Sequence, residues 1–202
     1  MPGYRSFFIL MPMSSASIND AIAACKAGDL SAFDTLYTEY VERLYGYLYR
    51  RTLHRQTAED LTSTTFLKAL ERIAQFNPKR GTFSAWLYGI ARNTLTDHFR
   101  THRTHADIQN IWDLASDDDT RARTDAVINA QKIHDALRIL DPLKREIVLL
   151  RVWENLSYRE IAQIVGKSEG NCKTIFCRAL ESLREECGPS LLTMIILFPF
   201  LR

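Results

Sequence analysis

The segment Leu156–Arg184 constrains the fold most, because the start and stop signals of two helices follow one another within it. Ser157 and Glu160 form an S-x-x-E capping box, which is typical of a helix N-terminus. Gly166 can end that helix in the left-handed conformation, and Ser168 can cap a second helix soon afterwards. The segment therefore predicts a helix, a tight turn and a second helix.

The second of these helices has one apolar and one polar face. Apolar residues recur in it at helical spacing, which leaves a polar set facing outward: Glu169, Asn171, Lys173, Thr174 and Arg178. Asn, Lys, Thr and Arg side chains contact base edges and phosphates when a recognition helix enters the major groove of DNA. A surface hairpin of two helices with a solvated polar face fits the same pattern, so the rest of the chain has to decide.

Helical periodicity also dominates the N-terminal half, where no run shows the alternation of a strand. We expect four helices there: one from Ser17 to Gly28, one over 31–51, one from Thr57, and one over 82–102 after a turn at Asn77–Gly81. Thr57-Ala-Glu-Asp60 is interpreted as the capping sequence of the third helix. The buried side of that helix is predicted to be Leu61, Phe66, Leu67, Leu70 and Ile73.

Residues 104–126 lose this periodicity and carry six Asp against two Arg. They are predicted to form a flexible acidic linker. Helical spacing returns at Val127, and Asp141 followed by Pro142 predicts the N-cap and first residue of a further helix. We therefore expect an all-α chain with an N-terminal extension (1–16), two small helical domains (17–103 and 127–187) joined by the linker, and an apolar tail (188–202).

Basic side chains concentrate in the first domain, where residues 43–103 contain eleven Lys/Arg against four Asp/Glu. Such an excess favours a polyanionic partner such as nucleic acid. No Ser, Tyr or metal-ligand cluster stands beside an activating neighbour, so we expect no catalytic residue, no cofactor and no metal. The spacing of His98, His102 and His105 is interpreted as the polar end of a DNA-facing helix, since no carboxylate or cysteine completes a metal site.

The chain also has features that bear on its location. Its four cysteines form no C-x-x-C pair and are interpreted as small core residues of a reducing compartment. Leu191–Phe200 is apolar but shorter than the roughly twenty residues that cross a bilayer. We therefore expect a cytoplasmic protein with no integral membrane insertion, for which Met11 and Met13 are alternative starting residues. The tail could dock on a partner or fold back on the last helix.

Two sets of residues carry a resemblance to a known family. In the first domain they are Ala58-Glu59-Asp60-Leu61, Phe66, Phe83, Trp86, Leu87, Ile90-Ala91-Arg92-Asn93, Asp97 and Arg100. In the second domain they are Leu140, Pro142, Arg145-Glu146, Leu156-Ser157-Tyr158, Glu160-Ile161-Ala162, Gly166, Glu169-Gly170 and Lys173. In this order, and joined by an acidic linker, they resemble the extracytoplasmic-function (ECF) sigma factors of the sigma-70 superfamily, with a region 2 domain followed by a region 4 domain.

The resemblance implies a subunit that binds core RNA polymerase, double-stranded promoter DNA and melted single-stranded minus-10 DNA, and that commonly has an anti-sigma partner. The implied polymerase contacts are Asp60, Leu61, Ser63 and Phe66. Ser63 and Thr64 stand where the family usually has Gln and Glu. The implied minus-10 and melting residues are Asn77, Lys79, Arg80, Arg92, Asn93, Thr96, Arg100 and Arg103, whereas Trp86 is expected to pack in the core.

The second domain is implied to read the minus-35 element. The recognition-helix residues are Ser168, Glu169, Asn171, Lys173, Thr174 and Arg178, and the phosphate contacts are Tyr158, Arg159 and Lys167. Ile175 occupies a position that is often Arg in the family. The acidic linker would thread a polymerase channel or act as a solvated tether. The alternative function is a stand-alone helix-turn-helix regulator, against which the first domain argues, because it offers neither a ligand pocket nor a phosphoacceptor.

Overall fold

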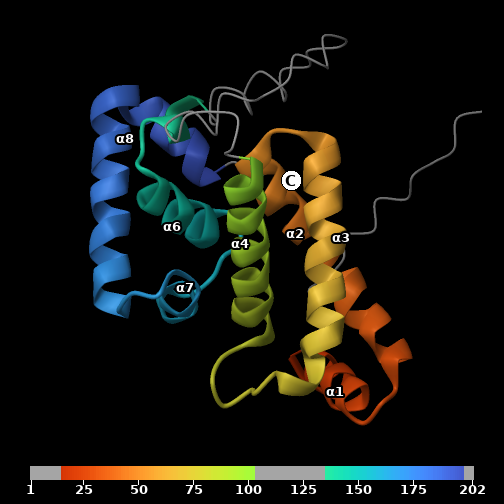
Figure 1. Cartoon of the computed structure of the whole chain (residues 1–202). Coiled ribbons are helices and arrows are strands. Elements are labelled where there is room, and N and C mark those ends of the chain that lie inside the picture. The colour runs from red at the N-terminus through yellow and green to blue at the C-terminus, as the bar shows by residue number, and fades with distance from the viewer. Residues whose placement is uncertain (1–14, 103–134, 198–202) are drawn as a thin grey trace, which may run out of the picture.

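The computed structural model describes residues 15–102 and 135–197, and every regular element within these ranges is a helix (Figure 1). The α-helices are α1 (Ser15–Lys26), α2 (Phe33–Thr52), α3 (Arg55–Arg72), α4 (Phe83–His102), α6 (Pro142–Val152), α7 (Tyr158–Val165) and α8 (Glu169–Leu197). Short 3-10 turns, Leu30–Ala32 and Ile73–Gln75, precede α2 and follow α3. Arg103, the expected linker, the restart of helical spacing at Val127, His105 and most of the N-terminal extension lie outside the described residues.

The first domain is a bundle in which α2, α3 and α4 pack side by side and α1 closes one end (Figure 1). Large side chains fill the space between the three helices, because each helix presents an apolar stripe at helical spacing. Leu44 and Leu48 of α2 and Leu87 of α4 are fully buried, and Phe66 of α3 lies edge-on to Phe33 with ring centroids 6.3 Å apart. The expected four-helix arrangement of this domain is confirmed.

Helix starts in this domain differ from the sequence prediction. The α3 helix begins at Arg55, and its N-cap is His54, whose ring nitrogen accepts a hydrogen bond from the Thr57 backbone N–H at 3.2 Å. The predicted cap at Thr57 was therefore wrong, because an imidazole nitrogen can satisfy the same free N–H as a hydroxyl. The described part of α1 starts at Ser15 and already contains Ser17, so Ser17 does not open this helix.

The helix-turn-helix predicted from the sequence is confirmed in its local detail. Ser157 and Glu160 make both hydrogen bonds of the capping box, and Gly166 ends α7 with a φ of 68°. The Ser168 hydroxyl accepts a hydrogen bond from the Asn171 backbone N–H at 3.2 Å, and so caps α8. Upstream, Asp141 caps α6 by accepting from the backbone N–H groups of its first turn. The α8 helix is broken at Gly188, the first residue of the expected tail.

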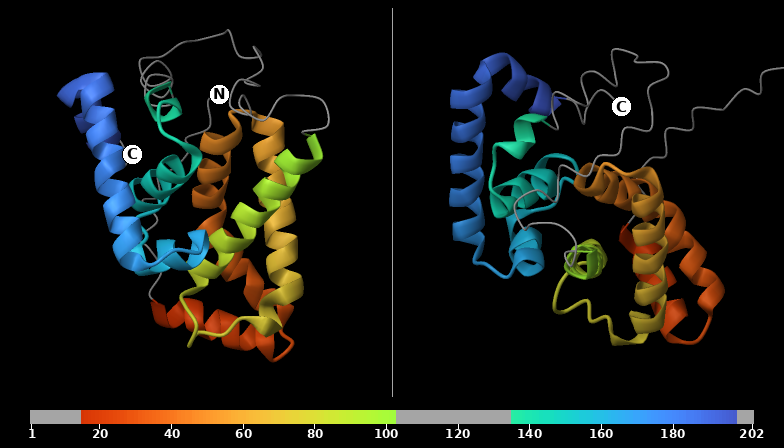
Figure 2. Two further views of the ribbon diagram at one scale, coloured as in Figure 1. Left: turned by 60° about the vertical axis from the view of Figure 1, so that its left-hand side comes forward. Right: turned by 45° about the horizontal axis from the view of Figure 1, so that its top comes forward.

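The two domains share apolar packing through α6, which lies with α7 between α8 and α4 (Figure 1). Ile147 and Leu150 of α6 belong to a buried cluster that is continuous with the first domain. The adjacent Val148 and Leu149 belong to a second cluster, which α8 completes through Leu183. Figure 2 shows α7 beside α4 in both views. The domains are therefore in direct contact.

None of the described helices is long and apolar enough to cross a membrane. Two of the cysteines, Cys25 and Cys172, are buried as expected, but Cys177 is exposed on α8, so its interpretation as a core residue was wrong. No group of three His, Cys, Asp or Glu side chains within the described residues could hold a metal ion.

Candidate nucleic-acid interface

The exposed face of α8 presents the polar residues that the sequence placed there. Asn171, Lys173, Thr174 and Arg178 are exposed, whereas Cys172 and Ala179 on the opposite side are buried. Burial of one side against α6 and α7 orients the helix and leaves its first two turns accessible. This is the disposition that a recognition helix needs to enter a major groove.

An ion pair partly neutralises this face. Lys173 Nζ lies 2.9 Å from Glu169 Oε1, one helical turn away. The hydrogen bond and the charge attraction raise the pKa of Lys173 and lower the pKa of Glu169. Both groups remain about half exposed, so the pair can separate at little cost when a phosphate competes for the ammonium group.

The three expected phosphate contacts lie in different environments. Arg159 and Lys167 are exposed, whereas Tyr158 is half-buried. The Tyr158 ring packs edge-on against Phe176 with centroids 5.8 Å apart, and the Arg151 guanidinium lies over it at 5.1 Å. The aromatic ring of Tyr158 therefore holds α7 against α8, in addition to any contact that its hydroxyl group makes.

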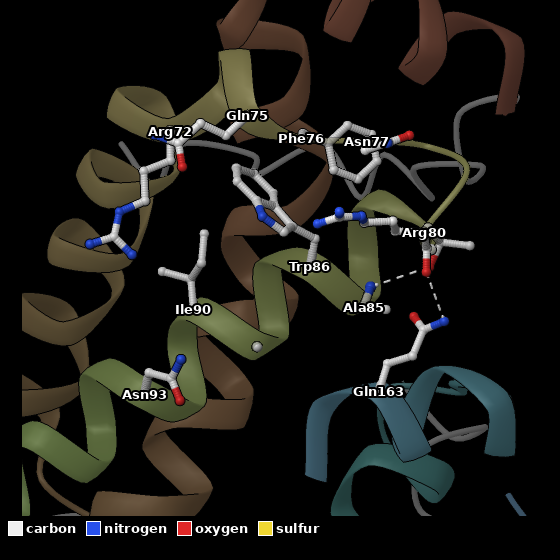
Figure 3. Close-up of a pocket in the computed structure, with 13 residues that line it drawn as sticks. Arg72, Gln75, Phe76, Asn77, Arg80, Ala85, Trp86, Ile90, Asn93 and Gln163 are labelled. Carbon is white, nitrogen blue, oxygen red and sulfur yellow. Dashed lines mark hydrogen bonds between the residues drawn. The ribbon is translucent and has the colours of Figure 1, made fainter. Parts of the chain in front are cut away.

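A second candidate surface surrounds the loop between α3 and α4, where an open pocket of about 530 Å³ lies (Figure 3). The loop is held in a tight turn, because Asn77 Oδ1 accepts from the Lys79 N–H at 3.0 Å and the Asn77 carbonyl accepts from the Arg80 N–H at 2.9 Å. The residues that line the pocket are Arg72, Gln75, Phe76, Asn77, Arg80, Gly81, Thr82, Ala85, Trp86, Gly89, Ile90, Asn93 and Gln163.

The half-buried Trp86 forms part of the wall of this pocket. Its ring packs against Phe76 and Phe83, with centroids 5.4 and 5.5 Å away. Packing in the core, as expected from its spacing, is therefore confirmed, and the same ring also lines the pocket. An aromatic surface beside guanidinium groups is suited to stacking with an unpaired base.

The structure brings some of the expected minus-10 residues together and separates others. Asn77, Arg80 and Asn93 line the pocket, Lys79 lines a neighbouring one of about 590 Å³, and Thr96 lines an adjoining hollow of about 310 Å³. Arg100 lies a turn beyond, 3.1 Å from Asp97. The half-buried Arg92 instead lies near Tyr47 and Arg51, because it is on another side of α4.

Sequence reasoning missed basic residues of α3 that adjoin this surface. Arg72 lines the main pocket and the adjoining hollow, and Lys68 lines the hollow, where its Nζ donates to Thr94 Oγ1 at 3.1 Å. The available signal was their spacing, i and i+4, in the last two turns before the loop. That spacing places both cations on the side of α3 that faces α4.

The expected polymerase-binding residues are divided between surface and core. Asp60 and Ser63 of α3 are exposed, whereas Leu61 and Phe66 are buried, with exposed fractions of 6% and 4%. Leu61 lies on the buried side of α3, as its spacing predicted, so its side chain is not exposed for a polymerase contact. Leu67 is the exposed apolar side chain of this surface, with an exposed fraction of 61%, and its predicted burial was wrong. Helical periodicity identified the apolar stripe of α3 but not which residues at the edge of that stripe are exposed.

Comparison with known sequences assigns each half of the chain to a protein family region. The sequence profile of Sigma-70 region 2 matches residues 36–105, and that of Sigma-70, region 4 matches residues 130–183. The ECF RNA polymerase sigma factor BldN of Streptomyces coelicolor is 38% identical over 172 residues, and RNA polymerase sigma factor YlaC of Bacillus subtilis is 30% identical over 163 residues. The chain belongs to the ECF sigma factors of the sigma-70 family.

The match to the relatives extends along most of this ECF sigma factor. It covers 84% of the chain for BldN and 79% for YlaC, and it spans 65% of BldN and 94% of YlaC. Region 2 therefore comprises α2, α3 and α4, and region 4 comprises α6, α7 and the first part of α8.

Solved structures share the fold of this ECF sigma factor. CnrH, in complex with the cytosolic domain of CnrY, superimposes with a TM-score of 0.66 at 22% identity and covers 84% of this chain and 96% of that one. RpoE from Bartonella quintana, in complex with the anti-sigma factor NepR, has a TM-score of 0.60 at 24% identity and covers 76% and 94%. At these identities the likeness shows the fold.

Proposed function

We propose that this sigma factor binds core RNA polymerase in the cytoplasm and directs it to promoters through two separate DNA contacts. Region 4 reads the minus-35 element in the major groove, and region 2 captures the melted minus-10 element. The observation that carries the proposal is the presence, in one chain, of an exposed polar face on α8 and an aromatic and cationic pocket at the α3–α4 loop.

In region 4, we assign the DNA contacts of the recognition helix to Ser168, Glu169, Asn171, Lys173, Thr174 and Arg178. The main phosphate contacts are Arg159 and Lys167, with Tyr158 in a supporting position. Asn and Arg side chains can each make bidentate hydrogen bonds to a base edge, so Asn171 and Arg178 would contribute most to sequence preference. Lys173 would contribute mainly to affinity, because an ammonium group that binds phosphate is indifferent to the base.

In region 2, the pocket offers a physical route to strand separation. Extruding a base costs a few kcal/mol in lost pairing and stacking. Stacking of the extruded base on an aromatic ring returns about 1–3 kcal/mol, and charge attraction holds the strand. Trp86 supplies the ring, Arg72 and Arg80 supply charge, and the carboxamides of Asn77 and Asn93 supply polar recognition. The contact with the strand would be extended by Lys79, Thr96, Arg100 and Arg103. Arg92, which lies on another side of α4, would help to hold that helix in position.

For polymerase binding we propose the α3 surface that contains Asp60, Ser63 and Leu67. The exposed carboxylate of Asp60 and the exposed side chain of Leu67 suit a basic, partly apolar partner. Leu61 and Phe66 would act from the core by fixing the position of α3. An anti-sigma partner is supported by CnrH and RpoE, whose structures were solved with CnrY and the anti-sigma factor NepR.

Transcription with purified core RNA polymerase tests the function. We expect the chain to give initiation at specific sites on a library of genomic fragments. On those fragments, Arg178→Ala should weaken binding to the upstream element by about 1–3 kcal/mol and relax the sequence preference there. Arg138→Ala removes an exposed cation outside both surfaces and serves as the matched control. The absence of site-specific initiation from every fragment would refute the proposal.

A further inference from the structure

Gly89 lies in the interior of α4, with helical backbone on both sides. Apart from proline, glycine is the least favourable residue in such a position, because it loses the most backbone freedom when the helix forms. Alanine at the same place would make α4 more stable. The glycine therefore lowers the stability of region 2.

Packing within the described residues does not account for this glycine. A Cβ atom built on Gly89 would meet nothing within 4 Å apart from its sequence neighbours and the backbone of its own helix. At Gly46 in α2, by contrast, a Cβ atom would lie 3.2 Å from the Arg50 side chain. The backbone conformation does not require glycine either, because Gly89 is α-helical and alanine adopts that conformation readily. The space beside Gly89 is therefore open to a molecule outside the chain.

That open space is the pocket at the α3–α4 loop, which Gly89 lines together with Trp86 and Asn93. Residues three and four apart share one face of a helix, so the glycine lies between the indole ring and the carboxamide on the same side of α4. Figure 3 shows Trp86 and Asn93 on the side of α4 that faces the pocket. Between these two side chains, the floor of the pocket is helix backbone.

Basic side chains of α3 border the same space. Arg72 lines this pocket and the adjoining hollow, and Lys68 lines the hollow, where its Nζ donates to Thr94 Oγ1 at 3.1 Å. Asp97 also lines the hollow, but its carboxylate lies 3.1 Å from the Arg100 guanidinium, which offsets its charge. Two cations one helical turn apart are suited to successive phosphates of a single strand.

The absence of a side chain matters most for a ligand that approaches the backbone closely. Glycine is favoured where a ligand comes near the main chain, because a Cβ atom would stand about 1.5 Å above the Cα atom. A planar base that stacks on Trp86 needs room beside the ring, and its sugar must pass the helix for its phosphate to reach Arg72. A methyl group at Gly89 would stand in that path.

We propose that Gly89 is a contact residue for the captured minus-10 nucleotide. Its missing side chain lets the base stack on Trp86 while the adjoining phosphate binds Arg72 and Lys68. The ligand of this gap is thus a nucleotide of single-stranded DNA, which offers a flat ring to the indole and an anion to the two cations. This inference rests on the function proposed above for region 2 and adds a residue to it.

Variants that add a side chain at Gly89 test the inference, because the fold and the DNA contact should respond in opposite directions. Gly89→Ala and Gly89→Leu should each raise the midpoint of thermal unfolding by about 1–4 °C. The full chain, assembled with core RNA polymerase, would then bind a fork probe that has a single-stranded minus-10 element and no minus-35 element. We expect the dissociation constant, measured by fluorescence anisotropy, to rise about fivefold for Gly89→Ala and about tenfold or more for Gly89→Leu.

An abasic probe shows whether the added side chain acts on the captured base. An abasic sugar is placed at each minus-10 position in turn, and the position that most weakens binding by the native chain marks the captured base. On that probe Gly89→Leu should have little further effect, because both changes remove the same stacking contact. Gly170→Ala is the matched control, since Gly170 is a glycine of α8 in open space. It should raise the thermal midpoint and leave binding of the fork probe unchanged.

Native affinity in both Gly89 variants would overturn the inference. So would a loss of affinity that is equal on the intact and abasic probes, or a fall in the thermal midpoint, which would mean that the fold itself needs the glycine. A different result bears on the proposed function: if no abasic position weakens binding by the native chain, region 2 does not capture a base, and the function proposed for the pocket fails together with this inference.

Discussion

Arg50 and Glu154 are 104 residues apart in the sequence, yet their side chains form a hydrogen-bonded ion pair 2.6 Å long at the boundary between region 2 and region 4. The carboxylate is almost completely buried, whereas the guanidinium reaches it from the rim. Removing either partner would therefore affect the contact between the regions more than the fold of either one.

Tyr88 provides a conservative test of this contact, because Tyr88→Phe removes a hydroxyl and keeps the ring. The ring packs edge-on against Tyr47, with centroids 5.3 Å apart, and that packing would persist. Loss of the hydrogen bond would leave one Glu154 oxygen without this donor, which should lower the free energy of unfolding by about 1–3 kcal/mol. Urea unfolding of the native chain and of Tyr88→Phe measures this change in the free energy of unfolding. Tyr37→Phe, at a side chain 44% exposed, should change little; equal effects would contradict the assignment.

Glu160 should make the contact between α7 and the α3–α4 loop depend on pH. Burial alone would raise the pKa of Glu160, but hydrogen bonds from Thr82, Ser157 and Ser84 together lower it below its ordinary value of 4.5. A carboxyl group with a lowered pKa in the folded state stabilises fully above its ordinary pKa, and this stabilisation disappears as the pH falls through the lowered value.

Comparing the native chain with Glu160→Gln isolates this effect, because glutamine can retain the capping box. We expect the native chain to be more stable at pH 7, and the difference to shrink as the pH is lowered from about 5. Thermal unfolding over pH 3–7 measures the difference. A gap that stays constant down to pH 3 would show that the ionised form of Glu160 is not responsible.

Gly166 and Gly170 should respond to alanine in opposite directions. Gly166 has a φ of 68°, a conformation that costs an alanine roughly 1–2 kcal/mol, although open space surrounds it. Gly170 lies in the first turn of α8, also in open space, so alanine there should stabilise the protein by about 0.4–1 kcal/mol. Denaturant unfolding of the two variants checks both signs. A stabilising Gly166→Ala would mean that the turn is remodelled.

Lys173 should contribute to DNA affinity without contributing to sequence preference. Lys173→Gln should weaken binding to all duplexes and lower the slope of log affinity against log salt concentration by about 1. Lys144→Gln is a matched control, since Lys144 also pairs with a neighbouring carboxylate, Asp141, at 3.6 Å, but lies outside the α8 face. Fluorescence anisotropy at several salt concentrations measures both slopes. A slope unchanged by Lys173→Gln would remove it from the phosphate contacts.

The helix-turn-helix could be predicted from the sequence because its signals are local. The capping box, the left-handed glycine and the Ser168 cap each act within four residues, where backbone geometry decides the outcome. The cap of α3 is also local, but His54 was overlooked, since a histidine is seldom a cap and Thr57 fits the usual pattern. Leu67 was misassigned, because periodicity does not show where an apolar stripe ends.

The contact between the regions could not be predicted in this way. Glu146 follows Arg145 in an ordinary helical sequence, and nothing near it indicates partners in α2. The sequence near Arg92 likewise contains no sign of its neighbours in α2, so Arg92 was assigned to the DNA face. In the structure it lies near Tyr47 and Arg51. Pairings across about a hundred residues depend on the whole fold. The pocket at the α3–α4 loop was predicted in part. Its loop residues follow one another in the sequence, whereas Arg72 and Gln163 reach the pocket from other elements.

Helix α6 presents both apolar and ionised side chains to the boundary between region 2 and region 4, and this makes their contact depend on temperature. Ile147 and Leu150 hold the regions together by the hydrophobic effect, which weakens on cooling. The cost of dehydrating Glu146, by contrast, falls as the temperature rises. Both trends favour the same direction, so warming should tighten the association of the two regions and cooling should loosen it.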